Sequence, residues 1–394
     1  MVSEWSNYTL KDIVDIEYGK SPKNVKVDYS GIPIFGTSGK VGYASKALFE
    51  GPLIMIGRKG TIDKPLLIKG DCWIIDTAYA AKPKQNVNIQ WLYYCLINSK
   101  LEKLNEATGV PSLNRENLYN LKLKVPPLNE QRKVASILTS VDETIDKTKA
   151  VIEQIEKVKK GLMQQLLTKG IGHTRFKKTE IGEIPEEWEV LLFNDVLGFV
   201  GSGITPKGGS TVYQLEGIPF IRSQNVYPDG LRLDDIAFIS EVIHEKMNRS
   251  KVQEQDVLLN ITGASIGRCT YVPIGFGEAN VNQHVCILRS NGKINYKYLA
   301  YFLNSSLGQR QIFSEQAGQT REGLNYQQIR SFRISVPPIA EQEKIASIIE
   351  SFNQKANNER KKLNTLKYLK KGLMQSLLTG KVRVNVDEAE VTQV

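Results

Sequence analysis

The sequence predicts a mixed α/β (α+β) protein in which two similar globular domains are each followed by one long helix. The first observation is a repeat: residues 125–137 (VPPLNEQRKVASI) return 211 residues later as residues 336–348 (VPPIAEQEKIASI). The second is that residues 161–168 (GLMQQLLT) return at the same offset as GLMQSLLT. The third is the stretch of residues 141–158 between the conserved parts, which shares no residue with its copy at 352–369 but has the same length. A retained length without retained residues is typical of a rigid spacer.

Residues 1–124 form the first predicted domain and residues 188–335 the second. Short runs of β-branched or aromatic residues, interrupted by Gly and Pro, predict small mixed sheets in both. The two domains also resemble each other faintly, since residues 53–62 (LIMIGRKGTI) are similar to residues 258–267 (LLNITGASIG). The chain is therefore predicted to have a pseudo-two-fold internal repeat.

Residues 125–169 and 336–381 are the predicted helices. A Pro-Pro pair marks the entrance of each, because proline disfavours helical geometry in the residue before it. Gly170 and Gly380 come after the last apolar turn and are expected to end the helices. Apolar residues recur in alternating steps of four and three, which is the heptad spacing of coiled coils. The predicted pairing residues are Val134, Leu138, Val141, Ile145, Ile152, Ile155, Leu162 and Leu166 in the first helix, and Ile345, Ile349, Phe352, Leu363, Leu366, Leu373 and Leu377 in the second.

The order domain, helix, domain, helix lets the chain fold back so that the two helices lie antiparallel. About 39 residues at about 1.5 Å each give a rod of about 58 Å. The alternative is two separate amphipathic helices, each lying on its own domain. Residues 170–187 are predicted to be a polar linker between the halves, and residues 382–394 a short tail with little order.

Composition restricts the functional class. The chain has 394 residues, 41% of them hydrophobic, and a net charge of +10, which is compatible with a nucleic-acid partner. No apolar run approaches the 18 or so residues that span a membrane, so we expect a cytoplasmic protein without a membrane partner. The four cysteines are scattered without paired spacing, which indicates buried thiols rather than disulfides or a metal site.

The helix opening VPP-x-x-EQ-x-K-[VI]-AS-I, the helix end GLMQ-x-LLT and the order of segments together resemble the specificity subunit of type I restriction-modification enzymes. The resemblance covers essentially the whole chain. It implies that residues 1–124 and 188–335 are target-recognition domains, each reading one half of a bipartite, asymmetric DNA sequence. It also implies that the helices form an antiparallel coiled coil, set the spacer between the half-sequences and dock two methyltransferase subunits.

The same resemblance implies that this chain is not catalytic by itself. Adenine methylation and cleavage of double-stranded DNA would belong to methyltransferase and restriction subunits, which would hold S-adenosylmethionine, ATP and Mg. The sequence agrees, because residues 36–40 (GTSGK) lack the first glycine and the final Ser/Thr of a phosphate-binding loop. The three histidines are far apart and form no known catalytic or zinc signature. We therefore expect no catalytic residue, cofactor or metal in this chain.

Candidate DNA-contacting residues are those whose side chains suit base edges or phosphates. Arg and Lys pair with guanine, Asn and Gln pair with adenine, and Gly-rich loops let backbone amides approach phosphate. For any single residue, the alternative is an ordinary solvated loop. The candidates in the first domain are Lys20, Lys23, Ser38, Lys40, Arg58, Lys59, Thr61 and Arg115. Those in the second are Lys207, Arg222, Gln224, Asn225, Ser265, Arg268, Asn282, Gln283, Arg321 and Asn325.

Two rival hypotheses belong to other classes. The first is a non-catalytic coiled-coil scaffold that binds proteins and never DNA, which the zero net charge of residues 170–335 favours. The second is a self-sufficient nuclease or methylase with an unrecognised active site.

Overall fold

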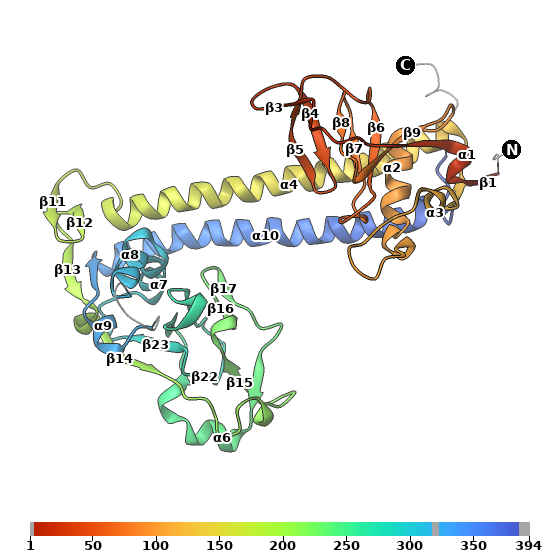
Figure 1. The fold of residues 1–394 in the computed structure, drawn as a ribbon. Coiled ribbons are helices and arrows are strands. Elements are labelled where there is room, and N and C mark those ends of the chain that lie inside the picture. The colour runs from red at the N-terminus through yellow and green to blue at the C-terminus, as the bar shows by residue number, and fades with distance from the viewer. Residues whose placement is uncertain (1–3, 317–322, 386–394) are drawn as a thin grey trace. The chain divides into compact units, whose positions relative to one another are not determined.

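A computed structural model describes residues 4–316 and 323–385 of the chain (Figure 1). The chain divides into two compact units. Unit 1 comprises Met1–Ala150 and Lys361–Val394, and unit 2 comprises Val151–Arg360. Each unit therefore contains one globular domain together with part of both long helices, α4 (Leu128–Lys169) and α10 (Ile339–Leu377).

Unit 1 contains two four-stranded sheets and one strand pair. The first sheet has the order β2 (Val14–Tyr18), β9 (Ala78–Pro83), β6 (Leu53–Gly57), β7 (Leu66–Ile68), and the second has the order β3 (Lys26–Val27), β5 (Gly39–Ala44), β4 (Ile32–Gly36), β8 (Trp73–Ile74). Strand β1 (Ser6–Thr9) pairs with β10 (Lys122–Val125). The helical segments are α1 (Leu10–Ile13), α2 (Ile89–Asn98), the short 3-10 helix Leu101–Leu104 and α3 (Arg115–Tyr119). Trp91 and Leu92 of α2 pack with Leu138 of α4 in one core, so the domain is built onto the helix.

Unit 2 has the same plan with larger loops. Its sheets have the orders β14 (Leu197–Ser202), β23 (Val285–Ser290), β20 (Val257–Asn260), β21 (Cys269–Tyr271), and β18 (Ala237–Ile239), β15 (Ile218–Ile221), β22 (Ala279–Val281), β19 (Lys251–Val252). Strand pairs are β13 (Glu189–Leu192) with β24 (Arg333–Val336), β16 (Val226–Tyr227) with β17 (Gly230–Leu231), and β11 (Phe176–Thr179) with β12 (Gly182–Pro185). The α-helices are α5 (Phe193–Val196), α6 (Glu241–Lys246), α7 (Tyr296–Asn304), α8 (Ser306–Ser314) and α9 (Tyr326–Arg330), and short 3-10 turns cover Gly209–Val212, Ser223–Asn225, Asn248–Ser250 and Gly263–Ser265.

Backbone hydrogen bonds fix which loop residues of the two domains correspond. Leu113 N donates to Arg58 O at 2.9 Å, and Leu324 N donates to Ile261 O at the same distance. Because Leu113 and Leu324 are 211 residues apart, Arg58 corresponds to Ile261. The sequence similarity had placed Arg58 opposite Gly263, two residues away. An error of two residues preserves the alternation of a strand, so the apolar pattern could not expose it.

The two long helices each begin directly after a Pro-Pro pair. Helix α4 ends at Lys169, before Gly170, whose φ of +65° suits the left-handed end of a helix, and α10 ends at Leu377, three residues before Gly380. Every predicted pairing residue is buried or half-buried.

Polar contacts between the helices explain the charged interruptions of the seam. In unit 1, Lys370 of α10 forms an ion pair with Asp142 of α4 at 2.6 Å. In unit 2, Lys159 of α4 donates to Asn353 of α10 at 3.1 Å. Lys159 is the counterpart of Lys370 in the repeat, and Asn353 is the counterpart of Asp142, each 211 residues away. Within unit 2, Arg360 also reaches Glu156 at 2.9 Å, so residue numbers rise along α4 as they fall along α10 and the helices are antiparallel.

The Glu-Gln pair of the repeated motif joins each helix to its own domain. Gln131 Oε1 accepts from Asn88 N at 2.7 Å, and Gln342 Oε1 accepts from Asn295 N at 2.7 Å. Both glutamines also donate to the carbonyl of the first proline of the Pro-Pro pair, at 2.9 and 2.8 Å. The repeat therefore preserves these residues as anchors between helix and domain.

The two glutamates bind equivalent tryptophans. Glu130 accepts from Trp5 Nε1 at 3.0 Å and from Arg383 at 2.8 and 2.7 Å. Glu341 accepts from Trp188 Nε1 at 3.0 Å and contacts His173 Nε2 at 2.9 Å. Each carboxylate thus lies in the first turn of its helix, where the helix dipole favours negative charge. Each also binds a segment that is distant in the sequence to the start of that helix.

The Glu130 carboxyl is expected to make unit 1 sensitive to acid. Burial opposes its ionisation, but hydrogen bonds from Arg383 and Trp5 outweigh burial and hold the pKa below its usual range. A carboxyl group whose pKa is lower in the folded than in the unfolded state stabilises the folded protein. This stabilisation is present above the unfolded-state pKa of about 4.3 and is lost as the pH falls through the folded-state pKa. Glu130→Gln should therefore lower the unfolding temperature at pH 7 and flatten its fall below about pH 4. Unfolding curves at pH 7 and pH 3.5 measure this, with exposed Glu143→Gln as the control. An acid slope equal to that of the unchanged chain would contradict the assignment.

The segment between the halves is more ordered than a linker. Residues 176–185 form the β11–β12 hairpin, and Ile184 at its end is 2% exposed in the core of unit 2. The sequence did not predict this hairpin, because two adjacent buried residues, Ile184 and Pro185, give no periodic signal.

The four cysteines agree with the expectation of buried thiols. Cys72, Cys95, Cys269 and Cys286 are buried free thiols. Among the described residues, no helix is long and apolar enough to cross a membrane.

Candidate nucleic-acid interface

Loops at the same ends of equivalent strands gather the candidate residues of each domain. Arg58 N donates to Thr77 O at 2.8 Å in unit 1, and Ile261 N donates to His284 O at 3.0 Å in unit 2. These bonds join the loop after β6 to the loop before β9, and the loop after β20 to the loop before β23. Each domain therefore presents a matched group of loops.

Two arginines and a tyrosine organise the unit 1 loops. The guanidinium carbons of Arg58 and Arg115 lie 5.3 and 5.0 Å from the centroid of the Tyr18 ring, a cation–π arrangement. Arg58 also donates to Asp76 O at 3.1 Å. Tyr18 itself packs edge-on against Tyr79. Burial raises the pKa of the Tyr79 phenol to about 12. Both arginines are thereby pre-oriented, although they lie 57 residues apart.

The other unit 1 candidates differ in their partners and exposure. Lys40 donates to Tyr43 Oη at 2.7 Å. Lys59 forms a β-bridge with Ser112, the residue just before Leu113. Thr61 is half-buried, whereas the remaining candidates are exposed: Lys20, Lys23 and Ser38.

Three amide candidates of unit 2 hold the fold. Asn225 is 1% exposed, accepts from Arg222 N at 2.9 Å and donates to Arg232 O at 2.8 Å. Asn282 is 8% exposed and accepts from His284 N, and Asn325 accepts from Gln328 N to cap α9. These hydrogen bonds all lie inside the domain. The sequence could not separate the buried amides of Asn225 and Asn282 from an exposed one such as that of Asn325.

The remaining unit 2 candidates include two exposed glutamines. Gln224 donates to Asp235 Oδ2 at 2.6 Å, and Arg222 donates to Asp235 O at 2.9 Å. Gln283 accepts from Thr205 and contacts His284 Nε2 at 3.0 Å. Lys207 is exposed and Ser265 is half-buried, whereas Arg321 lies outside the described residues.

Sequence reasoning missed Tyr227, Arg232 and His284. Arg232 and the candidate Arg268 lie 5.1 and 4.9 Å from the Tyr227 ring centroid, at positions that are not equivalent to those of the stacking around Tyr18. His284 contacts Thr262 and its own neighbour Gln283, so it joins two loops. Tyr227 lies 41 residues from Arg268 in the sequence, and no local pattern marks their stacking.

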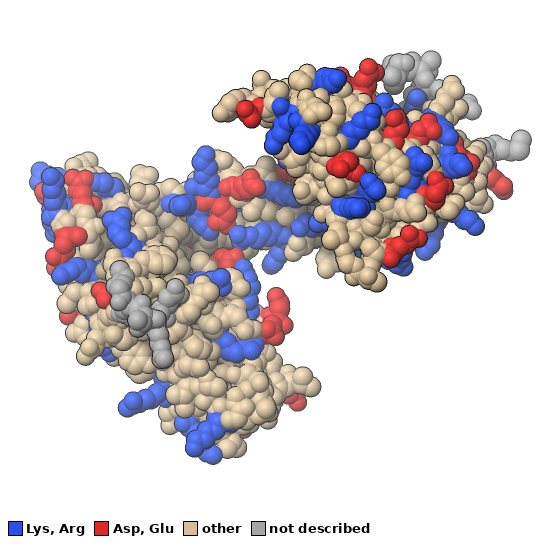
Figure 2. Space-filling model, in the orientation of Figure 1, with Lys and Arg blue, Asp and Glu red and all other residues tan. Residues whose placement is uncertain are grey.

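Charge on the surface is mixed. In the view of Figure 2, Lys and Arg side chains lie on both domains and along the visible helix surface, with Asp and Glu among them. On this face, a contact with phosphate would therefore rely on individually placed side chains more than on a continuous basic patch.

The described part of the chain offers no metal site. No group of three or more His, Cys, Asp and Glu side chains lies close enough to hold an ion. The thiols are poor nucleophiles, because burial raises the pKa of Cys72 to about 11 and that of Cys286 to about 12.

Comparison with known proteins identifies the family. Residues 2–157 and 185–368 match the model of the type I restriction modification DNA specificity domain. Two relatives are type I restriction enzyme specificity subunits of Methanocaldococcus jannaschii. MjaX is 30% identical over 76% of this chain and 70% of its own length, and MjaVIII is 28% identical over 84% and 76%.

A solved structure has the same fold. The S subunit of a type I restriction-modification system from M. genitalium superposes with a TM-score of 0.65 and 17% identity, covering 98% of this chain and 97% of that one. The two matched segments correspond to the two halves of the internal repeat. The chain therefore belongs to the type I restriction-modification DNA specificity family, whose members recognise DNA sequence and are not catalytic by themselves.

Proposed function

We propose that this chain reads a bipartite DNA sequence, with residues 1–124 and 188–335 each contacting one half. The supporting observation is the matched pair of loop groups. Each domain also has arginines stacked on a tyrosine, at positions that are not equivalent. Stacking removes conformational freedom from a guanidinium before it meets DNA, which lowers the entropic cost of a specific contact. Arg58, Arg115 and Arg268 are the leading candidates for contacts with guanine or phosphate.

The helices, residues 125–169 and 336–381, would set the distance between the half-sequences. They would also dock two methyltransferase subunits, with restriction subunits joining the full complex. S-adenosylmethionine, ATP and Mg would then be held by those partners. Double-stranded DNA is the remaining partner. The comparisons give no support to a scaffold that does not bind DNA.

Arg268→Ala tests the proposed interface. It should weaken DNA binding by the assembled methyltransferase, because a positioned cation is lost. If Arg268 contacts a phosphate, the slope of log K against log salt should become shallower by about 0.9. Titrations of labelled duplex at several salt concentrations measure both effects.

Arg175→Ala is the matched control, since it removes an exposed arginine beside the β11–β12 hairpin, outside the reading loops. The control should bind like the unchanged protein. An unchanged affinity and salt slope for Arg268→Ala would remove that residue from the interface.

A further inference from the structure

A small hairpin carries several candidate readers of the second domain. Strands β16 and β17 have two residues each, joined through Pro228 and Asp229. Arg222 and Gln224 precede the hairpin, Tyr227 lies in it, and Arg232 follows it. A two-stranded hairpin this short is not stable alone. Val226 anchors it in a core cluster of unit 2, and separate contacts hold the turn at Asp229.

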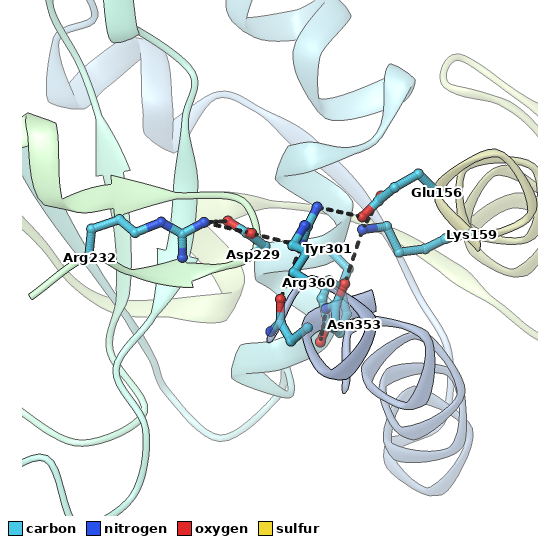
Figure 3. A network of polar contacts seen from close by, with 8 residues as sticks. Glu156, Lys159, Asp229, Arg232, Tyr301, Asn353 and Arg360 are labelled. Atoms are coloured by element: carbon cyan, nitrogen blue, oxygen red, sulfur yellow. Dashed lines mark hydrogen bonds and ion pairs between the residues drawn. The ribbon is translucent and has the colours of Figure 1, made fainter. Parts of the chain in front are cut away.

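An arginine of the long helix α10 contacts that turn. Asp229, whose side chain is 18% exposed, accepts from Arg232 at 2.8 and 2.7 Å and from Arg360 at 3.2 Å. Arg360 also donates to Asn357 Oδ1 at 3.0 Å and to Glu156 Oε1 of α4 at 2.9 Å (Figure 3). One guanidinium therefore joins the hairpin to both helices.

The contacts continue through the helix pair into the domain. Lys159 forms an ion pair with Glu156 at 2.7 Å and donates to Asn353. Asn353 donates to the hydroxyl of Tyr301 on α7 at 3.3 Å (Figure 3). The side chains of Glu156 and Asp229 are largely shielded from solvent, with 33% and 18% exposed, so screening by salt is reduced there.

The described residues of unit 1 carry a different arrangement at the equivalent helical positions. Lys149 is the counterpart of Arg360 in the repeat, and it pairs with Asp146 on its own helix at 2.9 Å. Lys367 is the counterpart of Glu156, so a cation replaces the carboxylate. The network is thus a feature of the second half that the internal repeat does not require.

We propose that Arg360 is a positioning residue for sequence recognition by the second domain. It holds the Asp229 turn against the helices, and through the hairpin it orients Tyr227 and the arginines stacked on it. Arg360 thereby sets the stringency of the second half-sequence while itself being part of the helix. This inference rests on the proposed function.

Arg360→Met, expressed with the methyltransferase subunits of its system, tests the inference by methylome sequencing. We expect methylation at sites with one wrong base in the second half-sequence to rise about tenfold relative to correct sites, the ratio that about 1.4 kcal/mol of lost discrimination gives. The first half-sequence should keep its stringency. Lys149→Met is the matched control, because it removes a cation from the equivalent helical position, and both halves should be read as before.

Further variants separate positioning from folding. Asp229→Asn should reproduce Arg360→Met, and Arg360→Lys should restore part of the discrimination because it keeps the charge. If Arg360→Met does not accumulate as folded protein, Asp229→Asn still decides the question. Normal stringency in Asp229→Asn, or an equal loss in both half-sequences, would overturn the proposal. Failure of the proposed function is distinguishable, since the unchanged chain would then direct no bipartite methylation at all.

Discussion

Inserting seven residues into each long helix is expected to widen the gap between the two half-sequences by about three base pairs. The insertions are placed after Ala150 in α4 and after Arg360 in α10, between the Asp142–Lys370 and Lys159–Asn353 contacts. Seven residues keep the heptad phase and add about 10.5 Å of helix. At about 3.4 Å per base pair, this is about three steps. Methylome sequencing reads the new gap directly, and both half-sequences should be unchanged.

An insertion in α4 alone is the informative control. It would leave one of the two polar contacts out of register, because α10 would lack the matching seven residues. We expect this variant to lose bipartite methylation or to accumulate poorly. An unaltered gap in the double insertion would show that the helices do not set the distance.

Trp188→Ala is expected to destabilise unit 2 by about 3–5 kcal/mol, the usual cost of removing a buried tryptophan. Trp188 is fully buried in the core of unit 2, and its indole is also a donor to Glu341. The substitution therefore leaves a cavity and removes one partner of a largely buried carboxylate. Denaturant unfolding measures the loss, and recognition of the second half-sequence should fall first.

Trp5→Ala is the matched variant in the other repeat. Trp5 makes the same hydrogen bond, to Glu130, but it is only half-buried. A smaller loss of stability is therefore expected, and unit 1 should carry it. Equal losses for the two variants would show that burial in the core is not what distinguishes the tryptophans.

The helices were predictable because their signals are local. Pro-Pro pairs, terminal glycines and heptad spacing all act within a few residues, and the observed α4 begins three residues inside the predicted segment. The reason for the repeated Glu-Gln pair was not predictable. Gln131 and Glu130 bind Asn88 and Trp5, which lie 43 and 125 residues away, and no local pattern indicates such partners.

The sequence indicated which loops are candidates for the interface, but it indicated the individual contact residues less well. Arg58 and Arg115 were candidates by residue type, whereas their common partner Tyr18 was not, because stacking depends on the sheet that brings them together. Asn225 was a candidate for the same reason, yet its side-chain amide is hydrogen-bonded to the backbone of Arg222 and Arg232. Residue type indicates what a side chain could bind, and only the fold decides whether it is free to do so.

Lys159 and Lys370 in the helix seam also disfavour a shift of one helix along the other. Sliding α4 by one heptad past α10 would place Lys370 opposite Ala135 or Lys149 instead of Asp142, and Lys159 opposite Ala346 or Arg360 instead of Asn353. Either direction leaves a partly shielded ammonium against a methyl group or another cation, which is unfavourable. If the helices set the distance between the half-sequences, as proposed, that distance changes only when whole heptads are added to or removed from both helices.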